Sequence, residues 1–290
     1  MSAGRVLRER LATGELIVAP GVFDGLSASL AGRMGFAAGY MTGAGVAAAG
    51  FGLPDIGLVT QTEMVERARV LVRCLGEVPL IADADTGYGS ALNVVRTVRE
   101  YEAAGVAAIQ LEDQAFPKKC GHLPDKELIP AEEFVVKLAA ALEARTDPSL
   151  VVIARTDARG PLGLDAAISR ARLYAAAGAD VIFVEAPESA AELERIAAEV
   201  DAPLLVNLVA GGLTPAESAE RLGAWGYGIA IHPSAPLGGV AWAMLQGLAE
   251  LAGKDPAEWV PGSPAEFFNL VGLAEWSRLG ERYRGAAAWG

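Results

Sequence analysis

The sequence of 290 residues predicts an α/β fold, a (β/α)8 barrel of the TIM type with a C-terminal helical extension. Short apolar runs recur along the chain, and amphipathic helical stretches separate them. The connection Ala-Ala-Gly-Val at 103–106 returns as Ala-Ala-Gly-Ala at 176–179, which is typical of a repeated β/α unit. Strands that alternate with helices in this way favour a closed barrel over an open doubly wound sheet.

Eight apolar runs are expected to form the barrel strands, with two of the eight β/α units less distinct than the others. Each run has the short length of a strand that is buried on both faces. The expected strands are Leu16–Ala19, Ala38–Met41, Pro79–Ala82, Ala107–Leu111, Leu150–Ala154, Val181–Val184, Pro203–Val206 and Gly228–Ile231.

Amphipathic stretches between these runs predict the surrounding helices. Apolar residues lie three or four positions apart, and Gly105 and Gly178 follow two of the stretches where a left-handed C-cap is expected. The expected helices include Glu63–Leu75, Leu92–Ala104, Ala131–Ala144, Leu164–Ala177 and Glu188–Val200.

The last forty residues are expected to extend the same domain, so that 1–290 is one domain with its barrel at about 14–250 and its extension at about 251–290. Three prolines between 256 and 264 precede an apolar helix at about Phe267–Arg282, and no Ser/Gly-rich linker separates this part. Its apolar side chains are expected to be buried, with a neighbouring subunit as one candidate partner. These side chains are Phe267, Phe268, Leu270 and Val271.

The composition excludes several functional classes. A formal charge of −12 and a pI near 4.7 disfavour nucleic acid and anionic membrane surfaces as partners. An anionic substrate therefore needs a local positive centre, either arginines or a metal ion. The sequence shows no signal peptide and no apolar run of membrane-spanning length. Its two cysteines form no Cys-x-x-Cys pair, so we expect a cytoplasmic protein with free thiols.

Polar residues follow five successive predicted strands, at the point where each strand ends. Charged residues often end strands because loops are solvated, but five such ends in one barrel favour a site at its C-terminal mouth. The residues are Asp83, Asp85, Glu112, Asp113, Arg155, Thr156, Asp157, Glu185 and Asn207.

Three of these carboxylates predict a metal site. Asp83, Asp85 and Glu112 offer only oxygen ligands and have no histidine near them in sequence, which suits Mg²⁺ or Mn²⁺ better than zinc. We expect one carboxylate to bind the ion directly and the others to act through water. Gly87 and Gly89 would let the backbone bend close to the ion.

Cys120 lies in a loop that follows the fourth predicted strand. Lys118, Lys119 and His122 flank it, and we expect these neighbours to lower the pKa of the thiol and favour proton transfer near neutral pH. Gly121 would act as a pivot for a loop that closes over the site. The alternative is a surface loop with an incidental free thiol.

The segment Gly43-Ala44-Gly45 half-matches a dinucleotide-binding fingerprint. Gly50, Gly52 and Pro54 interrupt the helix that this motif requires. We expect instead that the backbone N–H groups of residues 42–44 hold a carboxylate or a phosphonate. The second histidine, His232, follows the eighth predicted strand and is interpreted as structural.

With these motifs in place, the sequence resembles the isocitrate lyase/phosphoenolpyruvate mutase superfamily from about residue 16 to residue 250. The cysteine-containing segment is the most specific motif, and it resembles a branch with 2-methylisocitrate lyase, 2,3-dimethylmalate lyase, oxaloacetate hydrolase and carboxyphosphonoenolpyruvate phosphonomutase. The matching segments are Tyr40–Gly43, Gly52–Asp55, Asp83–Gly89, Leu111–Gln114, Lys118–His122 and Ala154–Ala158.

The resemblance implies a site and an assembly. Asp83 would bind Mg²⁺, and Asp55, Asp85 and Glu112 would hold its waters. Arg155 would neutralise the substrate, with Lys118 and His122 beside Cys120 as further catalytic residues. The chain would form a homotetramer, a dimer of dimers that exchange their C-terminal helices. The substrate-binding residues would be Thr42, Gly43, Ala44, Gly121, Glu185 and Asn207.

The implied reaction cleaves a carbon–carbon bond of a small 2-hydroxy or 2-oxo dicarboxylate, giving an α-keto acid or oxalate and a second carboxylate. Loss of the C2 hydroxyl proton, with help from Tyr40, would break the C2–C3 bond. Cys120 would then protonate the carbanion.

The sequence departs from 2-methylisocitrate lyases at two positions. These enzymes place arginines where this chain has Gly238 and Pro264. Loss of such a carboxylate clamp costs about 2–5 kcal/mol of binding, which favours a substituted malate or oxaloacetate over a tricarboxylate. The stretch Asn207–Pro215 resembles 2,3-dimethylmalate lyase, oxaloacetate hydrolase and the phosphonomutase. A phosphonomutase that rearranges a P–C bond, or a 2-methylisocitrate lyase, is the alternative.

Overall fold

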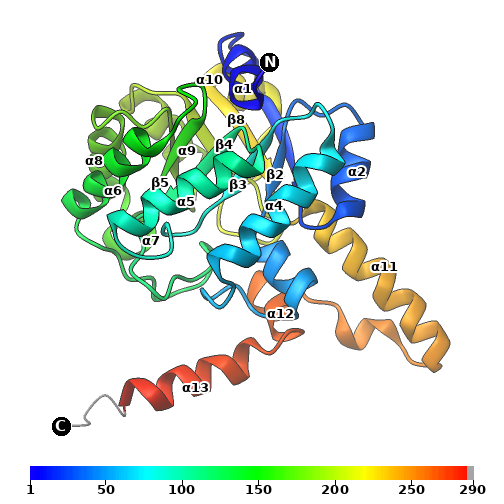
Figure 1. The fold of residues 1–290 in the computed structure, drawn as a ribbon. Coiled ribbons are helices and arrows are strands. Elements are labelled where there is room, and N and C mark those ends of the chain that lie inside the picture. The colour runs from blue at the N-terminus through cyan, green and yellow to red at the C-terminus, as the bar shows by residue number, and fades with distance from the viewer. Residues whose placement is uncertain (286–290) are drawn as a thin grey trace.

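The computed structural model describes residues 1–285 and contains a closed barrel of eight parallel strands (Figure 1). Each strand pairs with the next, and β8 pairs with β1. The predicted barrel is confirmed, and each expected strand lies within three residues of an observed one. The strands are β1 Ile17–Val22, β2 Gly39–Met41, β3 Leu80–Asp83, β4 Ala108–Glu112, β5 Val151–Thr156, β6 Val181–Val184, β7 Leu204–Asn207 and β8 Tyr227–His232.

Helices surround the barrel, and several begin or end at residues that cap their free backbone groups. Thr60 and Glu63 form a reciprocal capping box at the start of α4, and Gly105 ends α5 with φ +89°. All five expected helices are present. The helices as far as β8 are α1 Ala3–Leu11, α2 Gly25–Arg33, α3 Gly43–Gly45, the π-helix η1 Val46–Phe51, α4 Gln61–Leu75, α5 Ala91–Ala104, α6 Ala131–Ala144, α7 Arg159–Leu162, α8 Leu164–Ala176, α9 Ala190–Glu199 and α10 Ala219–Trp225.

The core has two layers, because successive side chains of a strand point to opposite faces. One layer fills the inside of the barrel and includes Ile81, Ile153 and Phe183. Leu7 of α1 joins this inner layer, so α1 closes the N-terminal end. The other layer lies between strands and helices, as with Leu71 and Phe134. A barrel filled in this way leaves its C-terminal end for a site.

The C-terminal extension departs from the expectation of one long helix. After α11 Ala235–Ala252 and the 3-10 turn η2 Pro256–Trp259, it contains two helices, α12 Pro264–Asn269 and α13 Leu273–Gly285. Gly272, with φ +86°, breaks the expected helix between them. The apolar pattern continues across the break and therefore concealed it.

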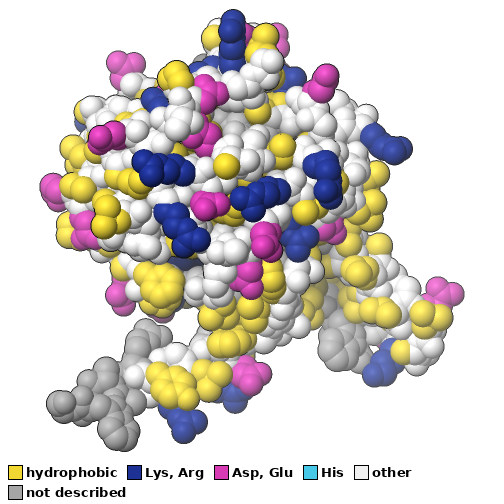
Figure 2. Space-filling view, viewed as in Figure 1, with side chains coloured by type: hydrophobic (Ala, Val, Ile, Leu, Met, Phe, Trp, Pro, Cys, Tyr) yellow, Lys and Arg dark blue, Asp and Glu magenta, His cyan; other side chains and the backbone are white. Residues whose placement is uncertain are grey.

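Two helices near the C-terminus project from the barrel, α11 on one side and α13 of the extension on the other (Figure 1). Phe268 of α12 is buried, whereas Leu270 is 51% exposed. Figure 2 shows hydrophobic side chains on the face of α11 that is turned to the viewer. Among the described residues 1–285, no helix is long and apolar enough to span a membrane. The exposed large apolar residues of α11 are Val240, Trp242, Met244, Leu248 and Leu251.

Candidate active site

A cavity of about 350 Å³ lies at the C-terminal ends of the strands. Most of the residues that the sequence predicted for the site line this cavity, and only Gly43, Asp85 and Glu112 lie behind its surface. The predicted residues that line it are Tyr40, Thr42, Ala44, Asp55, Asp83, Lys118, Cys120, Gly121, His122, Arg155, Glu185 and Asn207.

Asp83, the last residue of β3, is held by backbone and side-chain donors. Its Oδ2 accepts the Gly43 N–H at 3.2 Å, and its Oδ1 accepts the Asp85 N–H at 3.1 Å. A Cβ on Gly43 would lie 2.7 Å from Oδ2, so only glycine permits this approach. The Gly43 N–H was expected to hold the substrate, but it already donates its hydrogen bond to Asp83.

Gln110 connects Asp83 to Tyr40. The Tyr40 hydroxyl donates to Gln110 Oε1 at 3.1 Å, and Gln110 Nε2 lies 3.5 Å from Asp83 Oδ1. Burial and the Asp83 carboxylate raise the pKa of Tyr40 well above its ordinary value, so the phenol stays protonated and can donate a hydrogen bond. Sequence reasoning missed Gln110, although a glutamine inside the apolar run Ala107–Leu111 is a usable signal.

Lys118 bridges two carboxylates, Asp55 in the cavity lining and Asp85 outside it. Its Nζ donates to Asp55 Oδ1 and lies 2.7 Å from Asp85 Oδ1. Burial alone lowers the pKa of Lys118, but the charges of Asp55 and Asp85 outweigh this and raise it well above its ordinary value. Lys118 is therefore a permanent cation directed at these carboxylates.

The residues around Asp83 offer oxygen ligands, which are the ligands that a hard cation prefers. Asp55, Asp83 and Asp85 are buried carboxylates, and Asp85 Oδ1 has the ion pair with Lys118 but no aligned hydrogen bond. Within residues 1–285 these groups are not gathered into a ready cluster of three metal ligands. Carboxylate oxygens suit Mg²⁺, which usually keeps several waters between itself and a protein.

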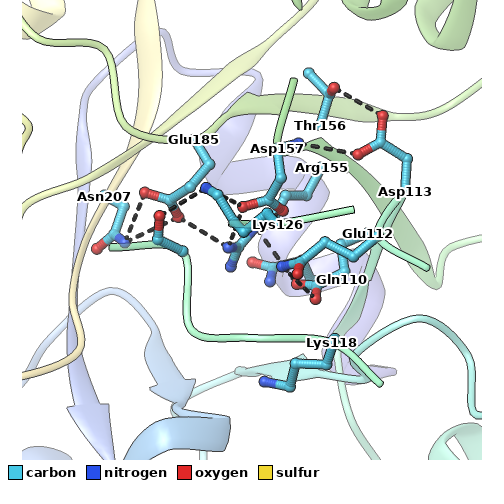
Figure 3. Close-up of polar contacts among 12 residues, drawn as sticks. Gln110, Glu112, Asp113, Lys118, Lys126, Arg155, Thr156, Asp157, Glu185 and Asn207 are labelled. Atoms are coloured by element: carbon cyan, nitrogen blue, oxygen red, sulfur yellow. Dashed lines mark hydrogen bonds and ion pairs between the residues drawn. The ribbon is translucent and has the colours of Figure 1, made fainter. Parts of the chain in front are cut away.

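Arg155, at the end of β5, is oriented by a buried carboxylate. Its Nε and Nη2 donate to Asp157 Oδ2 and Oδ1 at 2.8 and 2.9 Å (Figure 3). Glu112 and Glu185 lie 3.4 and 3.3 Å from the same guanidinium. Because Arg155 also lines the cavity, this network holds a positive charge in a fixed orientation at the cavity surface.

A second buried carboxylate, Asp113, holds Asp157 in place. Asp113 Oδ1 accepts the Asp157 N–H at 2.9 Å, and its Oδ2 accepts the hydroxyls of Thr156 and Tyr174, both at 2.8 Å. Arg170 donates to the same oxygen at 2.9 Å. The orientation of Arg155 thus depends on a network that reaches the helices behind the barrel.

The loop between β4 and α6 seats Cys120 against the cavity. The Cys120 N–H donates to Asp55 O at 3.0 Å, and the Gln114 side chain bonds both the N–H and the carbonyl of Lys119. Burial and the Asp55 charge raise the pKa of the Cys120 thiol to about 12. The expectation of a lowered pKa was wrong, because burial of the thiol outweighs the lowering by the charges of Lys118 and Arg155. Cys120 is therefore a protonated thiol.

The backbone at Gly121 rests directly on the strand ends. A Cβ at this position would overlap the Arg155 guanidinium and would lie 2.7 Å from the Glu185 side chain. Close approach, rather than a left-handed φ, therefore requires glycine here.

His122 connects the cysteine loop to the loop after β7. Its Nδ1 accepts the Leu213 N–H at 3.2 Å, so the neutral ring carries its proton on Nε2, which lies 3.6 Å from Glu185 Oε1. Burial lowers the pKa of His122. Asn207 donates to Glu185 Oε2 at 3.1 Å. The remaining histidine, His232, ends β8 and is half-buried outside the cavity lining.

The lining from residue 209 onward is uncharged. Among the described lining residues from 209 to 268, which we call the uncharged wall, none is ionisable. Gly238 and Pro264, where 2-methylisocitrate lyases are expected to carry arginines, both belong to it. The main residues of the uncharged wall are Val209, Pro233, Leu237, Pro261, Phe267 and Phe268.

Residues 7–252 match the family model described as phosphoenolpyruvate phosphomutase. The chain belongs to the phosphoenolpyruvate mutase family of the isocitrate lyase superfamily. It is 46% identical to 2,3-dimethylmalate lyase of Eubacterium barkeri, over 98% of this chain and 99% of that protein. It is 43% identical to a 2-methylisocitrate lyase of Aeropyrum pernix, over 95% and 89%. It is 40% identical to carboxyvinyl-carboxyphosphonate phosphorylmutase of Arabidopsis thaliana, over 92% and 81%.

Solved structures of the superfamily share the fold over the whole chain. A 2,3-dimethylmalate lyase superposes with a TM-score of 0.84 at 38% identity, covering 100% of this chain and 98% of that one. Oxaloacetate acetylhydrolase with the inhibitor 3,3-difluorooxalacetate gives 0.84 at 36% identity, with 97% of each chain covered. Phosphonopyruvate hydrolase in complex with oxalate and Mg²⁺ gives 0.74 at 32% identity, covering 98% and 99%.

We call the lining from Tyr40 to Asn207, which carries the ionisable residues, the charged half of the cavity. Membership of the phosphoenolpyruvate mutase family accounts for this half. The chain is an enzyme of this superfamily, and its relatives support a carbon–carbon lyase. None of the ionisable lining residues of the described chain belongs to the uncharged wall, so charged and uncharged groups lie on different parts of one cavity.

Proposed function

We propose that this enzyme cleaves the C2–C3 bond of a small alkyl-substituted malate, with Mg²⁺ as cofactor and Cys120 as proton donor. One observation carries the proposal: a single cavity joins a charged half, a half-buried protonated thiol and a wall without ionisable groups. In a dicarboxylate with an alkyl substituent, the carboxylates match the charged half and the alkyl group matches the uncharged wall.

Asp83 would hold Mg²⁺, with Asp55, Asp85 and Glu112 acting through its waters. When bound, the ion supplies Lewis-acid polarisation of the substrate C2 oxygen and the adjacent carboxylate. Mn²⁺ offers the same chemistry to these oxygen donors.

The side chains of the chain itself bind, orient and protonate. Arg155 neutralises a substrate carboxylate, and the Tyr40 hydroxyl is a hydrogen-bond donor beside the C2 oxygen. The C2 hydroxyl gives its proton to a carboxylate that lines the cavity, the C2–C3 bond breaks to leave the C2 carbonyl, and the electron pair of the bond remains on C3. The Cys120 S–H then forms the new C3–H bond, in a cavity from which the cysteine loop excludes water. For 2,3-dimethylmalate the products are pyruvate and propionate.

The uncharged wall argues against a tricarboxylate. A third carboxylate there would be desolvated beside Leu237 and Phe268 with no cation to pair it. Breaking such a buried pairing typically costs about 2–5 kcal/mol, a loss of about 30-fold or more in affinity. A methyl or larger alkyl group gains from the same surface.

A phosphonomutase remains the second candidate, because the Arabidopsis phosphorylmutase is 40% identical. A panel of substrates separates the two: 2,3-dimethylmalate, oxaloacetate, 2-methylisocitrate, isocitrate and phosphonopyruvate, each assayed for pyruvate, glyoxylate, oxalate or phosphoenolpyruvate. We expect the highest kcat/KM for the alkylated malate. Rearrangement of the phosphonate with no cleavage of any diacid would replace the lyase proposal by the mutase.

We also propose a homotetramer built from dimers that exchange α11 to α13. The exposed apolar side chains of α11 support this assembly, since 65% of Leu248 and 87% of Leu251 face solvent in the single chain. The free thiols of Cys74 and Cys120 support a cytoplasmic location.

A further inference from the structure

Lys126 is a buried amine in the segment that follows Cys120. Its neighbours Pro124, Asp125 and Glu127 are exposed, whereas Lys126 is only 8% exposed. Its Nζ donates to the Gly121 carbonyl at 2.6 Å and to Asp157 Oδ1 at 2.8 Å (Figure 3). A lysine is rarely buried unless it is paired, so these two contacts account for its position.

The two partners of Lys126 belong to different parts of the site. Gly121 adjoins Cys120 in the cysteine loop, and Asp157 is the carboxylate that orients Arg155. One ammonium group thus connects the backbone beside the thiol to the partner of the guanidinium.

We propose that Lys126 is a positioning residue that couples the closed position of the Cys120 loop to the orientation of Arg155. The proton donor and the anion-binding cation then take up their working positions in the same state. This role in turnover rests on the proposed lyase function, but the accessibility of Cys120 measures the coupling without any substrate.

The packing at Gly121 explains why a side chain from farther along the loop is needed to hold the loop in its closed position. Gly121 cannot carry a side chain, because a Cβ there would overlap Arg155 and approach Glu185 at 2.7 Å. Its carbonyl is therefore the group through which this part of the loop can be held. Lys126 reaches that carbonyl and places its charge next to Asp157 in the same contact.

The charges support the same coupling. Asp157 is fully buried and is shared between Arg155 and Lys126. Without Lys126, the Asp157 charge would act on Arg155 alone and draw the guanidinium away from a substrate. The Gly121 carbonyl would also lose its donor, which favours an open loop.

The test compares Lys126→Met with Glu127→Gln, a matched change at the adjacent, exposed residue, both in a Cys74→Ser background. The first measurement is the rate of Cys120 alkylation by iodoacetamide in the free enzyme, followed by intact mass. We expect at least a tenfold faster reaction in Lys126→Met and no change in Glu127→Gln. The second is steady-state kinetics, in which Lys126→Met should lower kcat at least tenfold and leave the Mg²⁺ concentration for half-maximal activity unchanged.

Equal alkylation rates in Lys126→Met and the parent would overturn the proposal, even if kcat fell, because Lys126 would then only stabilise Asp157. Faster alkylation in an enzyme that turns over no diacid would uphold the coupling and refute the lyase function. If Lys126→Met does not fold, Lys126→Gln, which keeps a donor but loses the charge, enters the same comparison with the same expected direction. Lys126→Arg should restore slow alkylation.

Discussion

At the scale of single residues, protonation states decide what each group can do. Burial holds Cys120 as a thiol and Tyr40 as a phenol, while carboxylates hold Lys118 as a cation. A thiol with a raised pKa is suited to give a proton to a strongly basic carbanion rather than to attack as a nucleophile. The direction of this pKa shift is opposite to the one expected from the basic neighbours of Cys120 in sequence.

We predict that Cys120→Ala lowers kcat by a factor of about 10² to 10⁴, the range for loss of a positioned acid. Binding of Mg²⁺ and of oxalate should remain close to that of the parent enzyme, because neither depends on the thiol. Isothermal titration of both ligands beside the kinetic assay checks this separation. Full activity in Cys120→Ala would remove the thiol from the mechanism.

The raised pKa of Cys120 also predicts its reactivity. With a pKa of about 12, about one thiol in 10⁴ is ionised at pH 8, and the ionised fraction rises tenfold with each pH unit below the pKa. In a Cys74→Ser background, alkylation of Cys120 should therefore be slow at pH 8 and still increase at pH 10. A rate that levels off near pH 8 would show an ordinary thiol.

At the scale of elements, the sequence predicts the residues at strand ends better than it predicts the contacts made by loops. The barrel strands are predicted because each is an apolar run, and the polar groups that follow converge wherever parallel strands close into a barrel. Asp83 and Arg155, which line the cavity, were predicted in this way. Lys126 was not, because the run Pro124–Glu127 resembles a solvated loop and its pairing with Asp157 arises only from the tertiary fold.

The cysteine loop gives a prediction at this scale. Gly121→Ala should lift the loop from Arg155 and Glu185, because the added Cβ has no room. A displacement of about 1 Å near reacting atoms can cost about 10²-fold in rate, so kcat should fall at least tenfold. Gly223→Ala is the control, since its Cβ would meet only Leu16 at an ordinary 4.0 Å. Equal kcat values for the two variants would argue against a closely seated loop.

At the scale of the whole molecule, the barrel has its own core but the extension does not. Phe268 packs at the cavity, whereas α11 projects with its apolar side chains exposed. An isolated chain would therefore carry an apolar surface that a second copy can cover. Sequence indicated the apolar extension but not its course, since the break at Gly272 lies within a continuous apolar pattern.

We predict that Leu248→Glu reduces the assembly to smaller species while the barrel remains folded. Leu162→Glu, at an apolar side chain of α7 that is 55% exposed, is the matched control and should leave the assembly unchanged. Light scattering after size-exclusion chromatography measures the mass, and circular dichroism checks the fold. A tetramer that persists in Leu248→Glu would exclude this face of α11 from the interface.

The most direct test of the lyase account is cleavage of 2,3-dimethylmalate in D₂O with Mg²⁺ present. The account predicts equal amounts of pyruvate and propionate, one deuterium at C2 of each propionate delivered from the exchanged Cys120 thiol, and loss of turnover in excess chelator. Absence of these products, together with rearrangement of phosphonopyruvate by the same preparation, would contradict it.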